Sequence, residues 1–592
     1  MRNIRTLASV LAASAILALT LSGAATRTAT ATPANIAPKF EDAPCPMKIP
    51  DGQHAENVRC GFLSVPETRG SADGRIIKIA VAILKSTSAR PKRDPVVYLT
   101  GGPGFPALDG ELQGLGQADT AAFIQSERDF IFFDQCGTGH YQQGLFCPET
   151  DHLVLDSLVL DRSPAEARAA RRTALVACHD RFVAQGVNVN AYSSVATAHD
   201  IADMMRVLGY DDYNLYGTSY GPRAILAAMR ETPNKIRSVI LDSPLAPQAN
   251  SGPDRAPDLQ RSLRELFDSC AADTKCHAAY PRLEEEAWDL IHRANAHPIE
   301  VQINDADGKP ITIRISGRTL LAGTFGAFYN ISLIRVLPFA IDQIANGNYG
   351  ILAILAQQLA FQFTGSAEAM GTSVDCNEEI PFYTSEQIRA ANNGVRQEII
   401  DAEIGTSTQA ALDDAQLLCR EWGTPAPRPR ENEAVVSAIP ALVLDGQFDP
   451  ITPPSYGKLA AEHLSRSFVY LFRSSGHGVT YEQYDCATNI IQQFLAAPPN
   501  RPNSACLTTI QPLDFVIGDN PTTRPSEAGS SPAAAQPSVP QQIIKGPDTG
   551  TGASAAPQHK INIAALLALT AAAALLAACG VTTARRSAHH DR

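Results

Sequence analysis

The sequence predicts an α/β protein with a mainly parallel sheet that is covered by helices. Short apolar runs bounded by turn residues recur along the chain, as buried strands do. Helical stretches lie between several of these runs, most clearly at 196–208 and 222–230. Alternation of this kind favours parallel strands joined by helices. The predicted strands are 76–84, 95–99, 130–133, 213–216, 239–241, 441–444 and 468–472.

Strand-like runs thin out in the middle of the chain, between residues 245 and 435. This block contains helical segments and one charged, hairpin-like piece near 304–314. We interpret residues 245–435 as a cap inserted into a sheet domain. The two parts of that sheet domain are then residues 42–244 and 436–515.

The N-terminal residues 1–24 have the features of a secretory signal sequence. Arg2 and Arg5 precede an apolar run, and small residues follow at 22–24. The chain has 61 acidic and 49 basic side chains, a net charge of -12. Nucleic-acid binding requires a basic surface, so we expect no nucleic acid as a partner.

The C-terminal part resembles a tether followed by a membrane anchor. Residues 516–560 include a stretch rich in Pro, Ser, Ala and Gly, which is typical of a flexible linker. Residues 561–583 are mainly apolar and predict a transmembrane anchor, with residues 584–592 as a cytoplasmic tail. A removed sorting signal or a weak Ala-rich helix is the alternative. We therefore expect a protein on the periplasmic or extracellular face of the cell membrane.

The chain has 12 cysteines, which should pair in an exported protein. Cys579 lies in the predicted anchor, and Cys136 is left over. A reactive Cys136 near His140 is one interpretation, and a buried thiol or an unexpected disulfide partner is the other. The predicted disulfides are Cys45–Cys60, Cys147–Cys178, Cys270–Cys276, Cys376–Cys419 and Cys486–Cys506. We expect no metal site, because disulfides explain the cysteines better, and no cofactor.

The sequence Gly217-Thr218-Ser219-Tyr220-Gly221 lies between a predicted strand and a predicted helix. A serine on such a sharp turn can act as a nucleophile if a base takes its proton and an acid holds that base. His477 follows the last predicted strand, and Asp449 follows the strand before it. The catalytic prediction is therefore Ser219, Asp449 and His477, with Asp445 as the alternative acid.

An oxyanion hole requires two N–H donors. The residue after the nucleophile, Tyr220, should supply one of them. The other should come from the glycine-rich loop after an early strand, Gly101-Gly102-Pro103-Gly104. Pro103 has no N–H, and Gly102 is the predicted donor. A phosphate-binding loop is not expected, because the Lys and Ser/Thr that it needs are missing.

Taken together, these motifs resemble the α/β-hydrolase group of prolyl and tripeptidyl aminopeptidases. The resemblance rests on GGPG, "FFDQCGTGH", "YGTSYG", "LDGQFDPITPP" and "SSGHG" in this order, and it covers roughly residues 45–506. It implies a helical cap before the acid loop and cleavage at free N-termini. Two positions depart from the family pattern, since Thr100 replaces a His and Cys136 replaces an Arg.

An aminopeptidase must also distinguish a free ammonium from an internal amide, and a carboxylate in the cap would do so. Glu378 and Glu379 follow Cys376 and are the predicted substrate-binding residues, with the resemblance favouring Glu378. A solvated cap loop is the alternative interpretation.

Three functions remain open at this point. The leading hypothesis is an exported serine aminopeptidase that forms an acyl-enzyme on Ser219 and acts on short peptides. A carboxylesterase or amidase would use the same triad. A non-catalytic surface binding protein is the third hypothesis.

Overall fold

A computed structural model describes residues 37–70, 74–140, 144–360 and 365–518 of the chain. Its centre is a nine-stranded sheet with the order β1-β2-β3-β5-β4-β6-β7-β10-β11. The strands from β5 to β11 in this order are parallel, and β1, β2 and β3 are antiparallel additions at one edge. The strands are β1 Lys39–Asp42, β2 Val58–Pro66, β3 Ile76–Leu84, β4 Val96–Leu99, β5 Phe130–Phe133, β6 Tyr213–Thr218, β7 Ile236–Asp242, β10 Ala441–Gly446 and β11 Ser467–Phe472.

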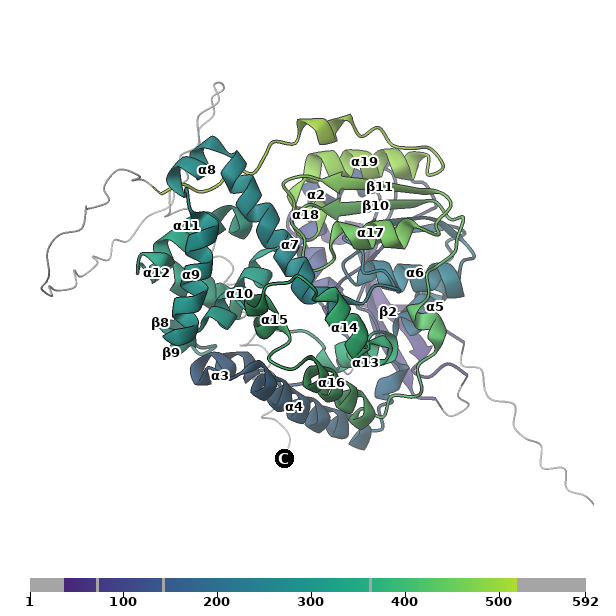
Figure 1. Ribbon diagram of the computed structural model, residues 1–592. Helices are drawn as coiled ribbons and strands as arrows, with labels where there is room; N and C mark the ends of the chain where they lie inside the picture. The colour runs from purple at the N-terminus through teal and green to yellow at the C-terminus, as the bar shows by residue number, and fades with distance from the viewer. Residues whose placement is uncertain (1–36, 71–73, 141–143, 361–364, 519–592) are drawn as a thin grey trace, which may run out of the picture.

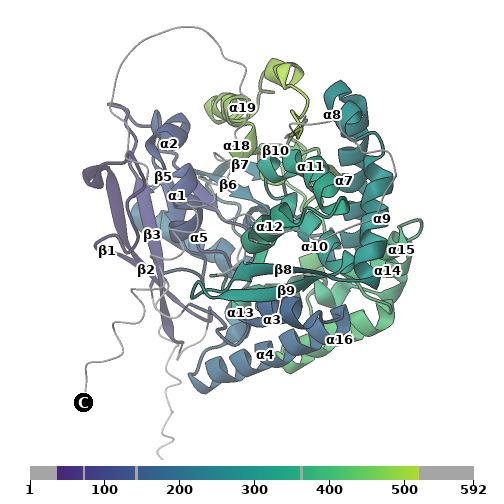
Figure 2. The same ribbon diagram turned by 90° about the vertical axis from the view of Figure 1, so that its left-hand side faces the viewer.

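All seven predicted strands are present, and the α/β fold class is confirmed. The sequence missed β1 and β2. In Figure 2 these two strands and β3 lie together at one side of the molecule, away from the cap helices. Three of the four residues of β1 are exposed or charged, so β1 lacks the apolar run that identified the central strands.

Helices cover both faces of the sheet. One apolar cluster lies between the sheet and α5 and α6, and a second lies between the sheet and α1, α2 and α19. Such a two-sided arrangement buries the near-continuous apolar runs of the parallel strands. The helices of this part are α1 Leu112–Leu115, α2 Ala118–Gln125, α5 Ser194–Leu208, α6 Gly221–Glu231, α17 Pro454–Ala461, α18 Val479–Glu482 and α19 Tyr484–Ala496.

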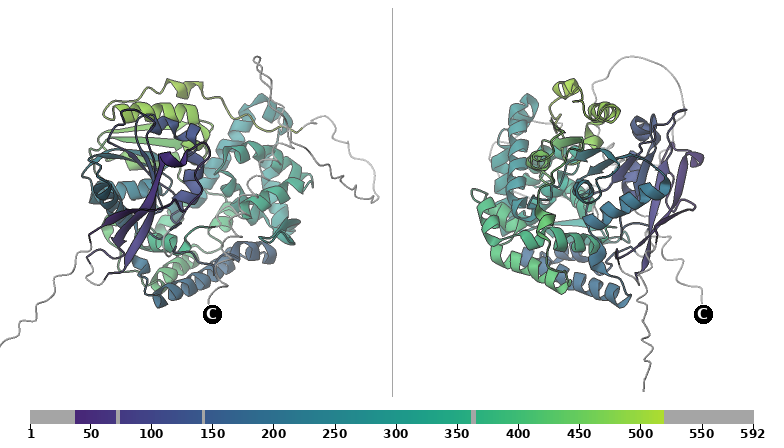
Figure 3. Two further views of the ribbon diagram at one scale, coloured as in Figure 1. Left: turned by 180° about the vertical axis from the view of Figure 1, so that it is seen from behind. Right: turned by 90° about the vertical axis from the view of Figure 1, so that its right-hand side faces the viewer.

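A helical cap lies to one side of the sheet, as Figure 1 and the rear view in Figure 3 show. The segment between β7 and β10 supplies most of it, together with a two-stranded hairpin, β8 Ile299–Asn304 and β9 Pro310–Ile315. The hairpin confirms the strand-like piece expected near 304–314. The cap helices of this segment are α7 Ser251–Ala272, α8 Thr274–Ala279, α9 Leu283–Ala296, α10 Gly317–Ala327, α11 Ile331–Ala345, α12 Gly350–Ala360, α13 Glu368–Glu378, α14 Ser385–Ala391, α15 Gln397–Glu403 and α16 Thr408–Glu421.

Two further helices, α3 Leu153–Leu160 and α4 Pro164–Ala184, join the cap although they precede β6 in the chain. Leu155 and Leu158 of α3 pack against the apolar cluster around the hairpin. On α4, Arg172 pairs with Asp414 at 2.9 Å, across to α16. The cap is therefore built from two separate stretches of sequence, whereas the sequence predicted one.

All five predicted disulfides are formed in the structure. Cys376–Cys419 joins α13 to α16 within the cap, and Cys147–Cys178 joins α4 to the loop that follows β5. Within the described ranges, Cys136 is the free cysteine, and its side chain is buried.

A C-terminal strap, residues 511–518, runs from the sheet domain across the cap. The carbonyl of Gln511 accepts a hydrogen bond from Ser474 Oγ at 2.8 Å. Leu513 and Phe515 are buried in the apolar cluster of the cap. The amide of Val516 donates to the carbonyl of a cap helix residue at 3.0 Å. The sequence placed the start of the flexible linker at 516, but residues 516–518 still contact the cap.

Removing the strap is expected to destabilise the protein. A chain that ends at residue 510 should lose about 3–6 kcal/mol of unfolding free energy relative to one that ends at 518. The reason is that burying a Leu or Phe side chain stabilises a protein by about 1.5–3 kcal/mol. Guanidinium unfolding of the two truncated proteins measures this difference. Equal midpoints would show that the strap packs without contributing to stability.

The predicted signal sequence at 1–24, the anchor at 561–583 and the tail at 584–592 lie outside the described residues, as does most of the predicted linker. Among the helices that the structure does describe, none combines the length and the apolar character needed to cross a bilayer.

Candidate active site

Ser219 lies on a sharp turn between β6 and α6. Its φ is +66°, a left-handed conformation that is strained for a residue other than glycine. Gly221 opens α6, and a Cβ there would lie 2.3 Å from the carbonyl oxygen of Leu99 in β4. The amide of Ser219 donates to Asp242 O at 3.0 Å, and its carbonyl accepts from Leu245 N at 3.0 Å. Close packing and these two hydrogen bonds hold the turn, and the serine stays partly exposed.

Asp449 and His477 are in hydrogen-bond contact at the carboxyl ends of β10 and β11. His477 Nδ1 and Asp449 Oδ2 are 2.8 Å apart. Asp449 Oδ1 accepts hydrogen bonds from the amides of Ile451 at 2.7 Å and Thr452 at 3.0 Å. Thr452 Oγ1 donates to Asp449 Oδ2 at 2.9 Å. The carboxylate is thus fixed by three donors in its own loop and aimed at the imidazole.

Both members of this pair are buried, with exposed fractions of 7% for His477 and 0% for Asp449. Burial acts to lower the pKa of His477, but the adjacent Asp449 outweighs it, so the pKa of His477 lies above its ordinary value. Cap residue Tyr329 packs edge-on against the imidazole, with 5.0 Å between ring centroids. The histidine is therefore held between the acid loop and the cap.

Asp445, the alternative acid, lies earlier, within β10. It is 1% exposed, and burial raises its pKa well above the ordinary value. A Cβ on Gly457 would lie 2.1 Å from its carboxylate, so the side chain is enclosed against α17. Asp449, and not Asp445, forms the hydrogen bond to His477, and Asp449 is the acid that the sequence favours.

The glycine-rich loop after β4 approaches the serine closely. A Cβ on Gly101 would lie 2.9 Å from Ser219 Cβ. Gly102 has φ +113° and precedes a cis bond to Pro103. Within the described ranges, neither the amide of Gly102 nor that of Tyr220 donates a hydrogen bond. Both amides are thus available to an oxyanion.

The stretch "FFDQCGTGH" supports this loop from behind. Gln135 Nε2 donates to the carbonyl of Thr100 at 2.8 Å. Asp134 Oδ1 accepts from the amides of Ala107 at 2.9 Å and Leu108 at 3.0 Å. Burial raises the pKa of Asp134 to about 6. Thr100, which stands where the family has a His, is fully buried and takes part through its backbone.

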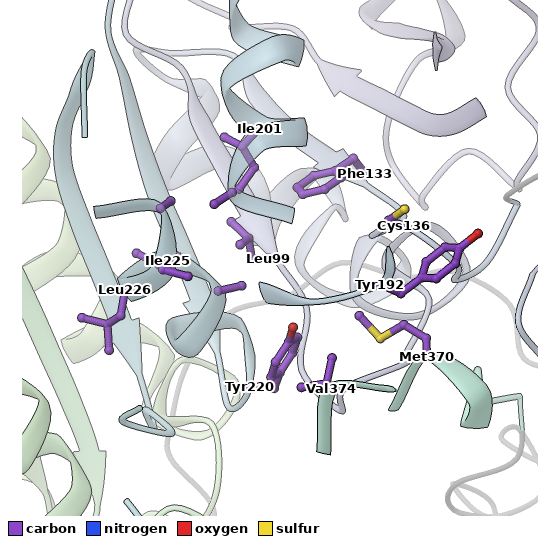
Figure 4. Close-up of a cluster of buried hydrophobic side chains, with 14 of the residues drawn as sticks. Leu99, Phe133, Cys136, Tyr192, Ile201, Tyr220, Ile225, Leu226, Met370 and Val374 are labelled. Atoms are coloured by element: carbon purple, nitrogen blue, oxygen red, sulfur yellow. The ribbon is translucent and has the colours of Figure 1, made fainter. Parts of the chain in front are cut away.

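Cys136 follows Gln135 and points into the apolar core, among the residues drawn in Figure 4. It is 3% exposed, and burial raises the pKa of its thiol well above the ordinary value. A buried, protonated thiol is a poor nucleophile, so the structure favours the buried-thiol interpretation over the reactive one. Next to it, Asp200 pairs with Arg69 from the loop after β2.

Glu378 and Glu379 at the end of α13 do not lie open to a substrate. They are 2% and 4% exposed, and both form ion pairs with Arg223 of α6. Glu378 Oε2 lies 3.1 Å from Arg223 Nε, and Glu378 Oε1 accepts from the amide of Ser194 at 2.7 Å. The second oxygen of Glu379 accepts from Tyr383 and from Ser251 at 3.1 Å. In this structure protein donors occupy the oxygens of both carboxylates, and their role in binding a substrate amine stays a prediction.

The ion pairs of Arg223 with Glu378 and Glu379 connect the cap to the turn that carries Ser219. Burial by itself lowers the pKa of Arg223, but Glu379 and Glu378 hold it above its ordinary value. The hydroxyl of Ser194, which donates to Glu378 at 2.6 Å, is also 2.9 Å from the hydroxyl of Tyr220. Figure 4 shows Tyr220 beside Val374 of α13. A cap helix is thus anchored directly behind the residue that follows Ser219.

Sequence reasoning missed Arg223, Thr452 and Ser194. An arginine in an otherwise apolar helix face four residues after Ser219 is a signal for a buried ion pair. Its partners lie 155 and 156 positions away, so the sequence alone could not connect them. Thr452 lies three residues after Asp449, a spacing typical of a serine or threonine that bonds a neighbouring loop carboxylate.

Two family models match the chain. One, described as "alpha/beta hydrolase fold", matches residues 94–274. The other, described as "TAP-like protein", matches residues 406–506. The chain has the α/β-hydrolase fold and a TAP-like region. The two matches cover the Ser219 turn and the two loops that carry Asp449 and His477, so the chain is a serine hydrolase.

Several curated proteins are similar to this α/β-hydrolase. Serine protease Hip1 of Mycobacterium tuberculosis is 24% identical over 487 residues, 78% of this chain and 90% of that protein. Tripeptidyl aminopeptidase of Streptomyces lividans is 27% identical over 288 residues, 46% of this chain and 51% of that protein. A solved proline iminopeptidase of Mycobacterium smegmatis is 14% identical and covers 74% of this chain and 98% of its own, with a TM-score of 0.35. That structural likeness is too weak to add to what the sheet itself shows.

Proposed function

We propose that this chain is an exported serine aminopeptidase that releases N-terminal residues or short peptides through an acyl-enzyme on Ser219. The observation that carries the proposal is the Asp449–His477 hydrogen bond beside a strained serine turn, all at the carboxyl ends of neighbouring strands. The names of the relatives, a serine protease and a tripeptidyl aminopeptidase, favour peptides over other acyl substrates.

Each residue then has a defined role. Ser219 Oγ attacks the acyl carbon while His477 Nε2 takes its proton. Asp449 holds the Nδ1–H of His477 and stabilises the imidazolium that forms. The amides of Gly102 and Tyr220 donate to the oxyanion of the tetrahedral intermediate. His477 next protonates the leaving amine, and it later activates the water that hydrolyses the acyl-enzyme.

A carboxylesterase or amidase is the second candidate, and one observation favours it. The two carboxylates expected to recognise a free amine are committed to Arg223. A panel of peptidyl anilides with free and acetylated N-termini, compared with p-nitrophenyl esters, separates the candidates. An aminopeptidase cleaves the free-amine anilides and spares the acetylated ones. Turnover of esters alone would favour the esterase, and failure to react with a fluorophosphonate would favour a non-catalytic binding protein.

Glu378→Gln is expected to act through stability and not through amine recognition. Removing one partner of a buried ion pair costs about 3–5 kcal/mol, so the unfolding free energy should fall by an amount of this order. On folded protein, kcat/KM for free-amine anilides and for p-nitrophenyl esters should fall by the same factor. Urea unfolding and the substrate panel measure the two effects.

Glu368→Gln on the same helix is the matched control for this substitution. Glu368 pairs with Arg171 at a partly exposed site. Exposed pairs contribute about 0–1 kcal/mol, so this variant should unfold almost like the wild type. A selective loss on free-amine substrates in Glu378→Gln would instead restore Glu378 as the amine-binding residue.

Export is supported by the five disulfides, which form and persist in oxidising compartments. The predicted anchor at 561–583 belongs to this proposal as well. Protease treatment of intact spheroplasts tests both. A catalytic part that resists protease until lysis would contradict the external location, and release without detergent would contradict the anchor.

A further inference from the structure

Glu482, the last residue of α18, accepts hydrogen bonds from two different parts of the molecule. Its Oε2 accepts from Ser475 Oγ at 2.8 Å and from the amide of Gly476, both in the loop that carries His477. Its Oε1 accepts from the amide of Ile331 at 2.7 Å. Ile331 is the first residue of cap helix α11, whose N-terminal amides have no partner within the helix. One carboxylate from the sheet domain thus satisfies a cap helix and the histidine loop together.

The same piece of the cap touches the histidine loop at two further points. The amide of His477 donates to the carbonyl of Phe328 at 3.3 Å. Tyr329 packs against the imidazole ring, as described above. A Cβ on Gly476 would lie 2.6 Å from Phe328 O, so the two segments are in close backbone contact. Because of these contacts, a movement of residues 328–331 would also displace the imidazole of His477.

We propose that Glu482 is a positioning residue that couples the orientation of His477 to the docking of the cap on the sheet domain. Both of its oxygens face donors, so the ionised carboxylate fits all three hydrogen bonds. A neutral carboxyl carries a hydroxyl hydrogen on one oxygen, which then faces an N–H or O–H donor. Protonation would loosen either the cap contact or the histidine-loop contact. The proposal rests on the proposed role of His477 as the catalytic base.

The surroundings of Glu482 bring the pKa of its carboxyl close to neutral pH. Burial raises its pKa to about 7, although the hydrogen bonds from Ser475, Gly476 and Ile331 act to lower it. The titratable groups that face it are Asp449, which raises its pKa further, and His477. In return, the negative charge of Glu482 acts to raise the pKa of His477. Activity should therefore require deprotonation of both groups, which gives the acid limb of the pH profile two linked ionisations.

Ester hydrolysis by Glu482→Gln tests the coupling, with rates divided by the fraction of Ser219 that a fluorophosphonate labels. We expect kcat to fall about tenfold, as for a small misplacement of a catalytic group, with KM little changed. The acid limb of kcat/KM should fall less steeply and move to lower pH, because one ionisation is gone and His477 loses a nearby negative charge. A purely structural role would lower the melting temperature and leave this limb in place.

Ser475→Ala provides a shift in the opposite direction. It removes a hydrogen bond that favours the ionised form of Glu482, so the acid limb should move to higher pH. Because Ser475→Ala keeps the carboxylate, this shift decides the question even if Glu482→Gln does not fold. An unchanged limb in Ser475→Ala would overturn the proposal.

Asn330→Ala is the matched control on the cap side. Asn330 Oδ1 caps α11 at the amide of Ser332, 2.8 Å away, and it does not contact Glu482. This variant removes the cap of α11 but keeps the amide of Ile331 on Glu482, so the acid limb should stay in place. The same limb shift as in Glu482→Gln would overturn the proposal.

Amide exchange supplies a readout that does not depend on turnover. Protection of the amides of Ile331 and Gly476 should fall in Glu482→Gln, whether or not the protein hydrolyses esters. Equal protection in the two proteins would overturn the coupling. Absence of turnover and labelling in a wild type whose protection depends on Glu482 would instead count against the proposed catalytic function alone.

Discussion

Ser219→Ala is expected to lower kcat by about 10⁶-fold, the loss typical of removing a serine nucleophile that acts together with its base. The turn itself should survive. Alanine is no more strained than serine at φ +66°, and the backbone hydrogen bonds to Asp242 and Leu245 do not involve the side chain. Steady-state kinetics on the best substrate of the panel, with urea unfolding beside it, measures both expectations.

Ser243→Ala is the matched control, because Ser243 is a second serine with positive φ, 49°, at the end of a neighbouring strand. Its hydroxyl accepts a hydrogen bond from the amide of Gly478 at 2.9 Å and has a supporting role next to His477. Fluorophosphonate should label Ser243→Ala stoichiometrically and leave Ser219→Ala unlabelled. A Ser219→Ala protein that keeps even a tenth of the activity would exclude Ser219 as the nucleophile.

The central strands and the candidate triad at their ends could be predicted because their signals are local. Each parallel strand is an uninterrupted apolar run, since helices bury it on both faces, and each catalytic residue directly follows such a run. Ser219, Asp449 and His477 also appear in the order that this arrangement of strands requires. The three residues then lie at the same edge of the sheet, because β6, β7, β10 and β11 are consecutive neighbours in it.

The burial of the acidic pair could not be predicted because it depends on a partner far away in the sequence. Glu378 and Glu379 look like exposed carboxylates in a cap loop until Arg223 is placed beside them. Glutamate side chains usually prefer solvent, but here the charge of the buried Arg223 compensates the two carboxylates. The docking of α3 and α4 on the cap was hidden for the same reason. Periodicity identifies a helix but does not say which distant surface it covers.

Glu378 and Glu482 both join the cap to the sheet domain. Through Arg223, Glu378 fixes the cap behind the nucleophile turn, and through Ile331, Glu482 fixes the cap to the histidine loop. Each contact uses a carboxylate that one domain supplies to a donor of the other, buried for Glu378 and half-buried for Glu482. On the coupling proposed above, cap docking and the alignment of Ser219 with His477 depend on each other.

Asp449→Asn is expected to lower kcat by about 10⁴-fold, the loss observed when an asparagine replaces the acid of a serine triad. The amide would keep the shape of the side chain, but it would no longer fix the tautomer of His477 or stabilise the imidazolium. The pKa of His477, which Asp449 holds above its ordinary value, should fall at the same time. The acid limb of the residual activity should therefore move to lower pH, and a pH profile of kcat/KM would show it.

Asp445→Asn separates this role from a general effect of removing a carboxylate near the site. Burial raises the pKa of Asp445 well above its ordinary value, which favours the neutral carboxyl, and asparagine is a close isostere of that form. Its Oδ1 has no hydrogen-bond partner within the described residues, and its loss leaves the Asp449–His477 contact intact. We expect little change in kcat and an unshifted acid limb. If Asp445→Asn instead lost as much activity as Asp449→Asn, the acid of the triad would have to be reassigned to Asp445, and the His477 contact seen with Asp449 would not be the one that operates during turnover.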